Sequence, residues 1–308
     1  MMPCPNYVET EEPSSPNPGD LPPNEAQLVE QLRAWKDRLP AFNESHVQFG
    51  VRLSEYIVDG LLTIDGERMR GLGRPSSTVA HDLALDIAWI FWLDDCFDSS
   101  PDNAPSELLS LHDFRLAEEQ QPLEVWSATR IRGSLRVGPR PIAAWELWMR
   151  SVIEMARAFQ HNQRLSRTGI DWSYAEYLDN GEVSSAVPHF VATVSLIYNL
   201  DMHERLADPT FVRMLRHLSL EMRLENDLVS LSKELDEGDC ANSVLLLSDV
   251  LGLEQARAFV EQQRIGHERM ALAAMNELGA ADPLVHASRL ILEGAHCFHA
   301  GERDRYPH

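Results

Sequence analysis

Apolar side chains recur at three- and four-residue intervals along this chain from Ala26 onward. That spacing places them on one face of an α-helix, whereas half-buried strands would need a strict alternation that is rarely seen here. Segments containing Gly and Pro separate the periodic stretches and mark where helices end. The pattern therefore predicts an all-α protein of about ten helices. The expected helices cover residues 26–38, 43–63, 76–97, 106–118, 141–164, 172–199, 209–236, 241–249, 253–278 and 281–300.

Residues 1–25 differ from the rest of the chain, because they are rich in Pro, Asn, Ser and Glu and contain almost no large apolar side chains. Such a segment cannot bury a core, so we expect it to be disordered. The predicted organisation is an acidic, Pro-rich tail over residues 1–25 and one helical domain over residues 26–308.

The expected helix 76–97 is unusual, because residues 87–93 are apolar on every side and yet are followed by Asp94, Asp95 and Asp98. A helix that is apolar all round is buried inside a bundle, and unpaired charge is costly there. Asp94 and Asp98 are four residues apart and share one helix face. Two carboxylates on one face suit Mg²⁺, although a fraying helix end in solvent would also explain them.

A second polar stripe lies in the expected helix 209–236, where Asn226, Ser230 and Glu234 follow each other at four-residue spacing. An amide oxygen, a hydroxyl and a carboxylate on one face form a reasonable shell for a dication that also binds phosphate oxygens. Arg223 and Lys233 add cations that can contact a phosphate group. The simpler interpretation is the polar outer face of a surface helix.

Charge limits the classes of partner. With a net charge of −21 and a pI near 4.9, the chain is a poor match for nucleic acid or for an anionic membrane. It can still bind a diphosphate if metal cations lie between the two. The sequence has no stretch of 18 apolar residues and no secretory signal pattern. The scattered cysteines are expected to be reduced thiols of a cytoplasmic protein: Cys4, Cys96, Cys240 and Cys297.

Three segments together resemble the class I terpene synthases. Asp94–Asp98 (DDCFD) is similar to their DDxxD motif, and residues 226–234 (NDLVSLSKE) match NDxxSxxxE at every specified position. Arg305-Tyr306 matches the C-terminal Arg-Tyr pair of the bacterial members. The resemblance covers about residues 26–306. It implies a single helical bundle with a central active-site cavity, and three Mg²⁺ ions that pull diphosphate off an isoprenoid substrate.

The resemblance also implies site residues. Metal ligands and catalytic residues would come from Asp94, Asp95 and Asp98 on one helix and from Asn226, Ser230 and Glu234 on the other. The diphosphate would be bound by Arg223, Lys233, Arg305 and Tyr306. One family feature is missing: many bacterial members place a diphosphate-sensing Arg about 46 residues before the motif Asn, where this chain has Asn180, followed by Gly181.

Two further segments, Phe91–Cys96 (FWLDDC) and Asp171–Gly181, resemble bacterial class I diterpene synthases of the ent-kaurene synthase type. Those enzymes act on a bicyclic C20 diphosphate such as ent-copalyl diphosphate, which a separate class II cyclase makes. This chain lacks the DxDD motif of a class II cyclase. The resemblance therefore implies a Mg²⁺-dependent diterpene synthase that yields a hydrocarbon or alcohol, follows a class II cyclase in its pathway, and forms a possible homodimer.

Alternatives remain at this stage. A sesquiterpene synthase acting on farnesyl diphosphate, or a cyclase acting directly on geranylgeranyl diphosphate, would carry the same metal motifs. A chain-elongating prenyltransferase would instead carry two aspartate-rich motifs. A non-enzymatic acidic helical protein that binds a partner would leave the carboxylates solvated.

Aromatic faces would stabilise a carbocation, although ordinary core packing also explains each of them. The candidates are Phe91, Trp92, Phe97, Trp172, Tyr174 and Tyr177. Asn180 and Gly181, with Pro188 after them, are expected to interrupt the helix 172–199 and to free backbone carbonyls toward the pocket. A kink that only lets two helices pack is the alternative.

Overall fold

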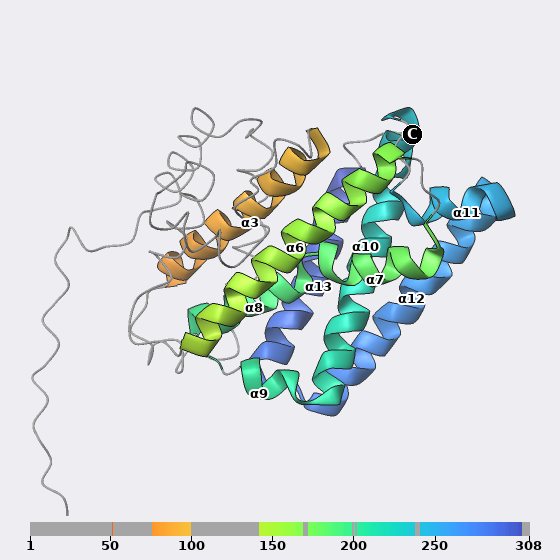
Figure 1. The fold of residues 1–308 in the computed structure, drawn as a ribbon. Coiled ribbons are helices and arrows are strands. Elements are labelled where there is room, and N and C mark those ends of the chain that lie inside the picture. The colour runs from red at the N-terminus through yellow and green to blue at the C-terminus, as the bar shows by residue number, and fades with distance from the viewer. Residues whose placement is uncertain are drawn as a thin grey trace, which may run out of the picture.

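Every regular element that the structure describes is an α-helix, so the all-α prediction is confirmed (Figure 1). The structure, a computed structural model, describes residues 51, 76–99, 142–168, 172–198, 200, 202–237 and 241–303. The expected tail 1–25 and the expected helices 26–38, 43–63 (except Val51) and 106–118 lie outside the described residues. The helices are α3 (Ser76–Ser99), α6 (Ile142–Thr168), α7 (Tyr174–Ser184), α8 (Val187–Tyr198), α9 (Met202–Leu206), α10 (Pro209–Glu237), α11 (Ser243–Leu251), α12 (Leu253–Leu278) and α13 (Pro283–Arg303).

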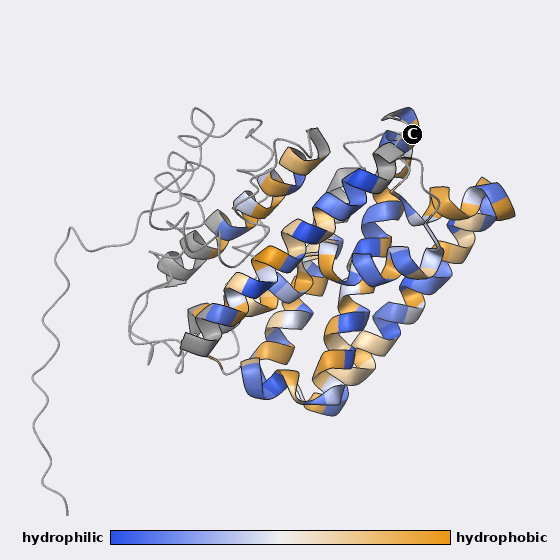
Figure 2. Cartoon of the chain, viewed as in Figure 1, coloured by the Kyte–Doolittle hydropathy of each residue, from blue (hydrophilic) through white to orange (hydrophobic). Residues whose placement is uncertain are grey.

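Six of the seven expected helices that fall in the described part have bounds within a few residues of those observed. The predicted helix 253–278 coincides with α12. Helix α9 was not expected, because its five residues are too few to show a helical period. Hydrophobic periodicity therefore located the long amphipathic helices well, as Figure 2 illustrates by the apolar and polar faces along them.

The expected helix 172–199 is interrupted, as predicted, and forms two helices, but the predicted position of the break is wrong. We expected the interruption at Asn180–Gly181, but α7 continues to Ser184 and the break falls at Ser185–Ala186. Ala186 has a φ of 62°, which is strained for a residue with a Cβ. Pro188 lies in the first turn of α8, where its missing N–H costs no hydrogen bond, so the proline starts a helix instead of kinking one.

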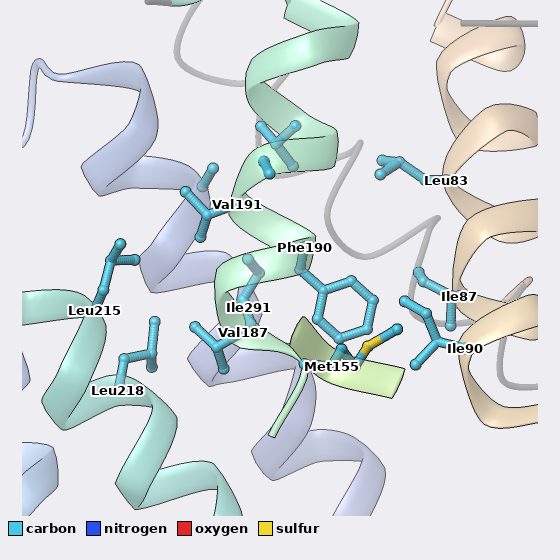
Figure 3. Close-up of a cluster of buried hydrophobic side chains, with 14 of the residues drawn as sticks. Leu83, Ile87, Ile90, Met155, Val187, Phe190, Val191, Leu215, Leu218 and Ile291 are labelled. Atoms are coloured by element: carbon cyan, nitrogen blue, oxygen red, sulfur yellow. The ribbon is translucent and has the colours of Figure 1, made fainter. Parts of the chain in front are cut away.

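The core lies where α3, α6, α8, α10 and α13 meet. Figure 3 shows Phe190 of α8 reaching toward Ile87 and Ile90 of α3, with Met155 of α6 beside them. The predicted burial of residues 87–93 is confirmed, since Phe91 alone among them is partly exposed. Helix α12 packs along α10 on the side away from α3 (Figure 1). No described helix is long and apolar enough to cross a membrane.

A buried polar network joins α3, α6 and α8 inside this core. The Asp86 carboxylate, fully buried, lies 3.2 Å from Nε2 of His189 and accepts a 2.7 Å hydrogen bond from the Thr193 hydroxyl. Thr193 accepts from the indole N–H of Trp148 at 2.9 Å. Ser151 donates its one proton to the Trp148 carbonyl, so Nδ1 of His189 donates to Ser151. The Asp86 carboxylate thus has a buried imidazole and a hydroxyl as partners inside the core.

A second polar cluster joins α10, α12 and α13. The buried Glu221 carboxylate accepts hydrogen bonds from Arg264 at 3.0 Å and from Nε2 of His296 at 2.7 Å. Arg264 also pairs with Glu225 and Glu268. The hydrogen bond to Glu221, and the nearby carboxylates, raise the pKa of His296 above its usual value despite partial burial. The hydrogen bond between His296 and Glu221 thus helps to hold α13 against α10, and it is strengthened when the imidazole is protonated.

This pKa shift predicts a pH-dependent stability. Because the folded-state pKa is raised, the stabilisation by His296 is complete below the unfolded pKa of about 6.5 and is lost as pH rises through the folded-state value. Between about pH 6 and pH 9 we expect the wild-type Tm to fall roughly 1–2 °C more than that of His296→Gln, after discounting for solvent screening. His203→Gln, at an exposed site on α9, serves as the control. If the Tm of the wild type and that of His296→Gln change equally with pH across this range, His296 does not cause the pH-dependent stability.

Candidate active site

A cavity opens between α3, α6, α8, α10 and α13, and each of the two predicted metal motifs contributes one residue to its described lining, whereas Ser230 and Glu234 are not among the lining residues. Asp94 from α3 and Asn226 from α10 both line it, although they are far apart in sequence. The break between α7 and α8 forms part of its wall. The described lining residues are Ile90, Phe91, Asp94, Phe159, Ser184, Ser185, Ala186, Phe190, Met222, Arg223, Asn226 and Ala295. The cavity therefore has apolar and aromatic walls and a group of polar side chains.

Helix α3 delivers Asp94 to this cavity because its apolar residues fix it in the core up to the acidic motif. Asp94 is partly exposed, whereas Leu93, just before it, is fully buried. Phe91 also lines the cavity. The side chains of Asp95 and Asp98 lie outside the described part of the structure, so their predicted role as ligands stays a prediction.

Helix α10 carries the second motif on one face. Asn226 is exposed, Ser230 donates a 2.7 Å hydrogen bond to the Asn226 carbonyl, and Glu234 is partly buried. Burial, followed by the negative charge of Asp227, raises the pKa of Glu234 to about 7, although Arg223 opposes this shift. A nearby cation would stabilise the charged form of this partly desolvated carboxylate.

These residues fit magnesium. Carboxylate, amide and hydroxyl oxygens are hard donors, and Mg²⁺ usually takes one or two carboxylates while keeping other positions for water and phosphate. Asp94 and Asn226 line one cavity from two different helices, so both offer oxygen donors to it. Lys233 is exposed on α10, while Arg305 and Tyr306 lie outside the described residues.

Arg223 lines the cavity, but protein groups already hold two of its nitrogens. Its Nε donates to the Tyr177 hydroxyl at 2.7 Å and lies 3.3 Å from Oδ1 of Asp227. Its Nη2 donates to the Ala241 carbonyl at 2.8 Å. The Tyr177 hydroxyl in turn donates to the Asp227 carboxylate, whose oxygens lie 2.8 and 2.7 Å away. Arg223 is therefore fixed in place at the wall of the cavity.

Gly181 explains how α7 approaches α10 so closely. A Cβ at this position would lie 3.0 Å from Cγ of Arg223. Asn180 points instead toward α6, where its amide donates to the Ala158 carbonyl and to Asn162. Neither residue belongs to the described cavity lining.

Most of the predicted aromatic residues are not among the described lining residues of the cavity. Trp92 and Phe97 are buried in the core, and Phe97 packs against Phe159. Trp172 packs edge-on against Tyr177. Of the predicted aromatic set, the described lining contains Phe91.

Sequence reasoning missed several lining residues. Phe159, Phe190, Met222 and Ala295 face the cavity from four helices. No signal marked them, because an apolar residue on an amphipathic helix looks the same whether it faces core or cavity.

Comparisons with known proteins agree with this geometry. The family model for terpene synthase family 2, C-terminal metal binding, matches residues 87–271. The sesquiterpene cyclase hepA of Aspergillus oryzae is 30% identical over 105 residues, which is 34% of this chain and only 28% of that relative.

Solved structures share the fold across nearly the whole chain. The linalool/nerolidol synthase of Streptomyces clavuligerus, in complex with 2-fluorogeranyl diphosphate, has a TM-score of 0.68 at 18% identity, over 92% of this chain and 96% of that one. The 2-methylisoborneol synthase of Streptomyces coelicolor A3(2), in complex with Mg²⁺ and geranyl-S-thiolodiphosphate, has a TM-score of 0.70 at 15% identity, over 91% and 92% of the two chains. The helical bundle is thus the class I terpene synthase fold.

Proposed function

The chain belongs to terpene synthase family 2, and from that premise we propose that it ionises an isoprenoid diphosphate and cyclises or rearranges the resulting carbocation. The single observation that carries this proposal is the shared cavity of Asp94 and Asn226. It joins the DDCFD and NDLVSLSKE motifs beside apolar walls, as a metal-dependent reaction on an apolar substrate requires. We further propose three magnesium ions, held by Asp94, Asp95 and Asp98 and by Asn226, Ser230 and Glu234.

When bound, magnesium would supply the positive charge that stabilises the leaving diphosphate. The protein's own residues account for the rest of the chemistry. Phe91, Phe159 and Phe190 come from three helices and present aromatic surface to a cation, where each desolvated contact contributes on the order of 1–2 kcal/mol. The apolar walls exclude water from the reactive cation.

The break between α7 and α8 places polar groups in the otherwise apolar wall. Ser184, Ser185 and Ala186 line the cavity, and the Ser184 hydroxyl is buried with no hydrogen-bond partner among the described residues. An unpartnered hydroxyl and a strained turn at this place are available to orient the cation or to accept its proton. We propose that this break, and not Asn180–Gly181, provides the polar groups of the cavity wall.

The substrate is proposed from two sources. The name of the relative hepA, a sesquiterpene cyclase, favours farnesyl diphosphate as a C15 substrate. The segments Phe91–Cys96 and Asp171–Gly181 favour a C20 copalyl-type diphosphate, with a class II cyclase upstream. We retain the C20 substrate as a second candidate on the strength of those segments.

The test is product analysis by gas chromatography–mass spectrometry with Mg²⁺ and each of farnesyl, geranylgeranyl, ent-copalyl and normal copalyl diphosphate. A product from farnesyl diphosphate alone supports the C15 proposal, and a product from only a copalyl substrate supports the C20 one. If no substrate is turned over and inorganic diphosphate with Mg²⁺ leaves the Tm unchanged, the proposed function is wrong.

Gly181→Ala is expected to lower kcat/KM roughly tenfold, because its Cβ would press on Arg223 Cγ at 3.0 Å and displace the guanidinium from the cavity wall. The matched control is Gly266→Ala on α12, where an added Cβ meets nothing within 4 Å. Steady-state assays with the preferred substrate measure both variants. If Gly181→Ala keeps the rate and product profile of the wild type, the Arg223 side chain can shift to accommodate the added Cβ without affecting catalysis.

A further inference from the structure

Asn242 bridges the start of α11 and the metal motif of α10. It is fully buried, and it is the N-cap residue of α11. Its Oδ1 accepts from the backbone N–H of Val244 at 2.8 Å and of Leu245 at 3.4 Å. Its Nδ2 donates to Oε2 of Glu234 at 2.7 Å and to the Asp227 carbonyl at 2.8 Å.

The orientation of this amide is fixed by its four neighbours. Two of them are N–H donors and face Oδ1, while a carbonyl and a carboxylate face Nδ2. Exchanging the oxygen and the nitrogen would set donors against donors and acceptors against acceptors. The side chain therefore has one satisfied arrangement, and in it an N–H always points at Glu234.

The neighbouring backbone strengthens the bridge. The Ala241 carbonyl accepts from Nη2 of Arg223 at 2.8 Å and lies 3.1 Å from the Tyr177 hydroxyl oxygen, and the Ser243 N–H donates to Asp227 at 3.1 Å. Residues 241–243 are thus anchored to groups of α7 and α10 on both sides of Asn242. A donor on so rigid a segment can hold a flexible glutamate in one rotamer.

We propose that Asn242 is a positioning residue for magnesium, which fixes the Glu234 carboxylate in the geometry in which it binds the ion. This inference rests on the proposed function. Glu234 lies in the last turn of α10, where a helix frays most readily, and its side chain has three rotatable bonds. A short hydrogen bond from an amide to a carboxylate is charge-assisted and removes much of that freedom. Groups that orient metal ligands typically change metal affinity by about 10–100-fold when they are lost.

The experiment separates capping from positioning. Asn242→Ser keeps an oxygen that caps α11 but loses the Nδ2 donor, and Asn242→Asp keeps the cap but sets a second carboxylate against Glu234. Calorimetric titration of MgCl₂ with inorganic diphosphate present measures affinity without turnover. We expect Asn242→Ser to weaken Mg²⁺ binding about tenfold and Asn242→Asp to weaken it more. Excess Mg²⁺ should restore the rate of Asn242→Ser, a rescue that a merely structural defect would not show.

The control is Ser173→Ala, which removes the cap of α7 and its capping box with Glu176. It should lower the Tm but leave Mg²⁺ affinity unchanged. Wild-type Mg²⁺ affinity in both Asn242→Ser and Asn242→Asp would overturn the inference while leaving the proposed function intact. If Asn242→Ser does not fold, the Mg²⁺ affinity of Asn242→Asp alone tests the inference. Absence of both Mg²⁺ binding and turnover in the wild type would overturn the proposed function, and this inference with it.

Discussion

Replacing Glu234 by Gln should lower kcat/KM by about 10²–10³, the largest loss of activity we expect from a single substitution in the described part of the chain. The amide keeps the size of the side chain but removes the negative charge that a dication needs. The Asn242 amide, which now donates to the Glu234 carboxylate, can still donate to the amide oxygen, so the fold should be retained. The measurement is steady-state kinetics over a range of Mg²⁺ concentrations, with circular dichroism to verify folding.

Asp236→Asn is the matched control for Glu234→Gln. It removes one negative charge two residues away, on an exposed position of the same helix. If the removal of one negative charge from α10 were enough to lower activity, both variants would be affected alike. If the loss of a metal ligand is responsible, only Glu234→Gln is affected. Equal activity of Glu234→Gln and wild type at limiting Mg²⁺ would exclude Glu234 as a ligand.

The metal motifs could be predicted from the sequence because their information is local. Asn226, Ser230 and Glu234 follow one another at four-residue intervals on one helix, and helical geometry alone puts them on one face. The fully apolar stretch before Asp94 likewise predicted a buried helix that ends in polar side chains. The meeting of these two helices across one cavity followed only from the resemblance, since spacing within one helix says nothing about its neighbour.

The break between α7 and α8 shows where local reasoning failed. Gly181 suggested an interruption, yet it serves as a contact surface for Arg223, because a helix can tolerate a glycine when a neighbour must come close. The chain turns instead at Ala186, a residue with high helix propensity that gave no warning. Tertiary packing thus overrode propensity at this position.

The network of Tyr177, Arg223, Asp227 and Asn242 was also beyond sequence reasoning. Tyr177 and Asp227 are 50 residues apart, and their hydrogen bond depends on how α7 docks on α10. From the sequence, Tyr177 was a candidate cavity aromatic; in the structure its ring lies under Arg223 and its hydroxyl holds Asp227. Long-range contacts of this kind require the three-dimensional arrangement.

His189→Leu is expected to cause the largest loss of stability, about 3–5 kcal/mol, or a fall in Tm of roughly 6–15 °C. The substitution leaves the Asp86 carboxylate fully buried with the Thr193 hydroxyl as its one remaining partner in this network. An uncompensated buried charge costs far more than the pair contributes. Thermal unfolding followed by circular dichroism measures the effect.

The double variant Asp86→Asn/His189→Leu tests this reason for the loss. If the uncompensated charge is responsible, the neutral amide that replaces the Asp86 carboxylate should recover a large part of the stability, because its oxygen can still accept from Thr193. If the cost instead reflects the lost packing of His189 against Trp148, whose rings lie 5.4 Å apart, the double variant should melt no higher than the single one. The first outcome would show that the buried charge, and not the lost packing of His189, causes most of the destabilisation.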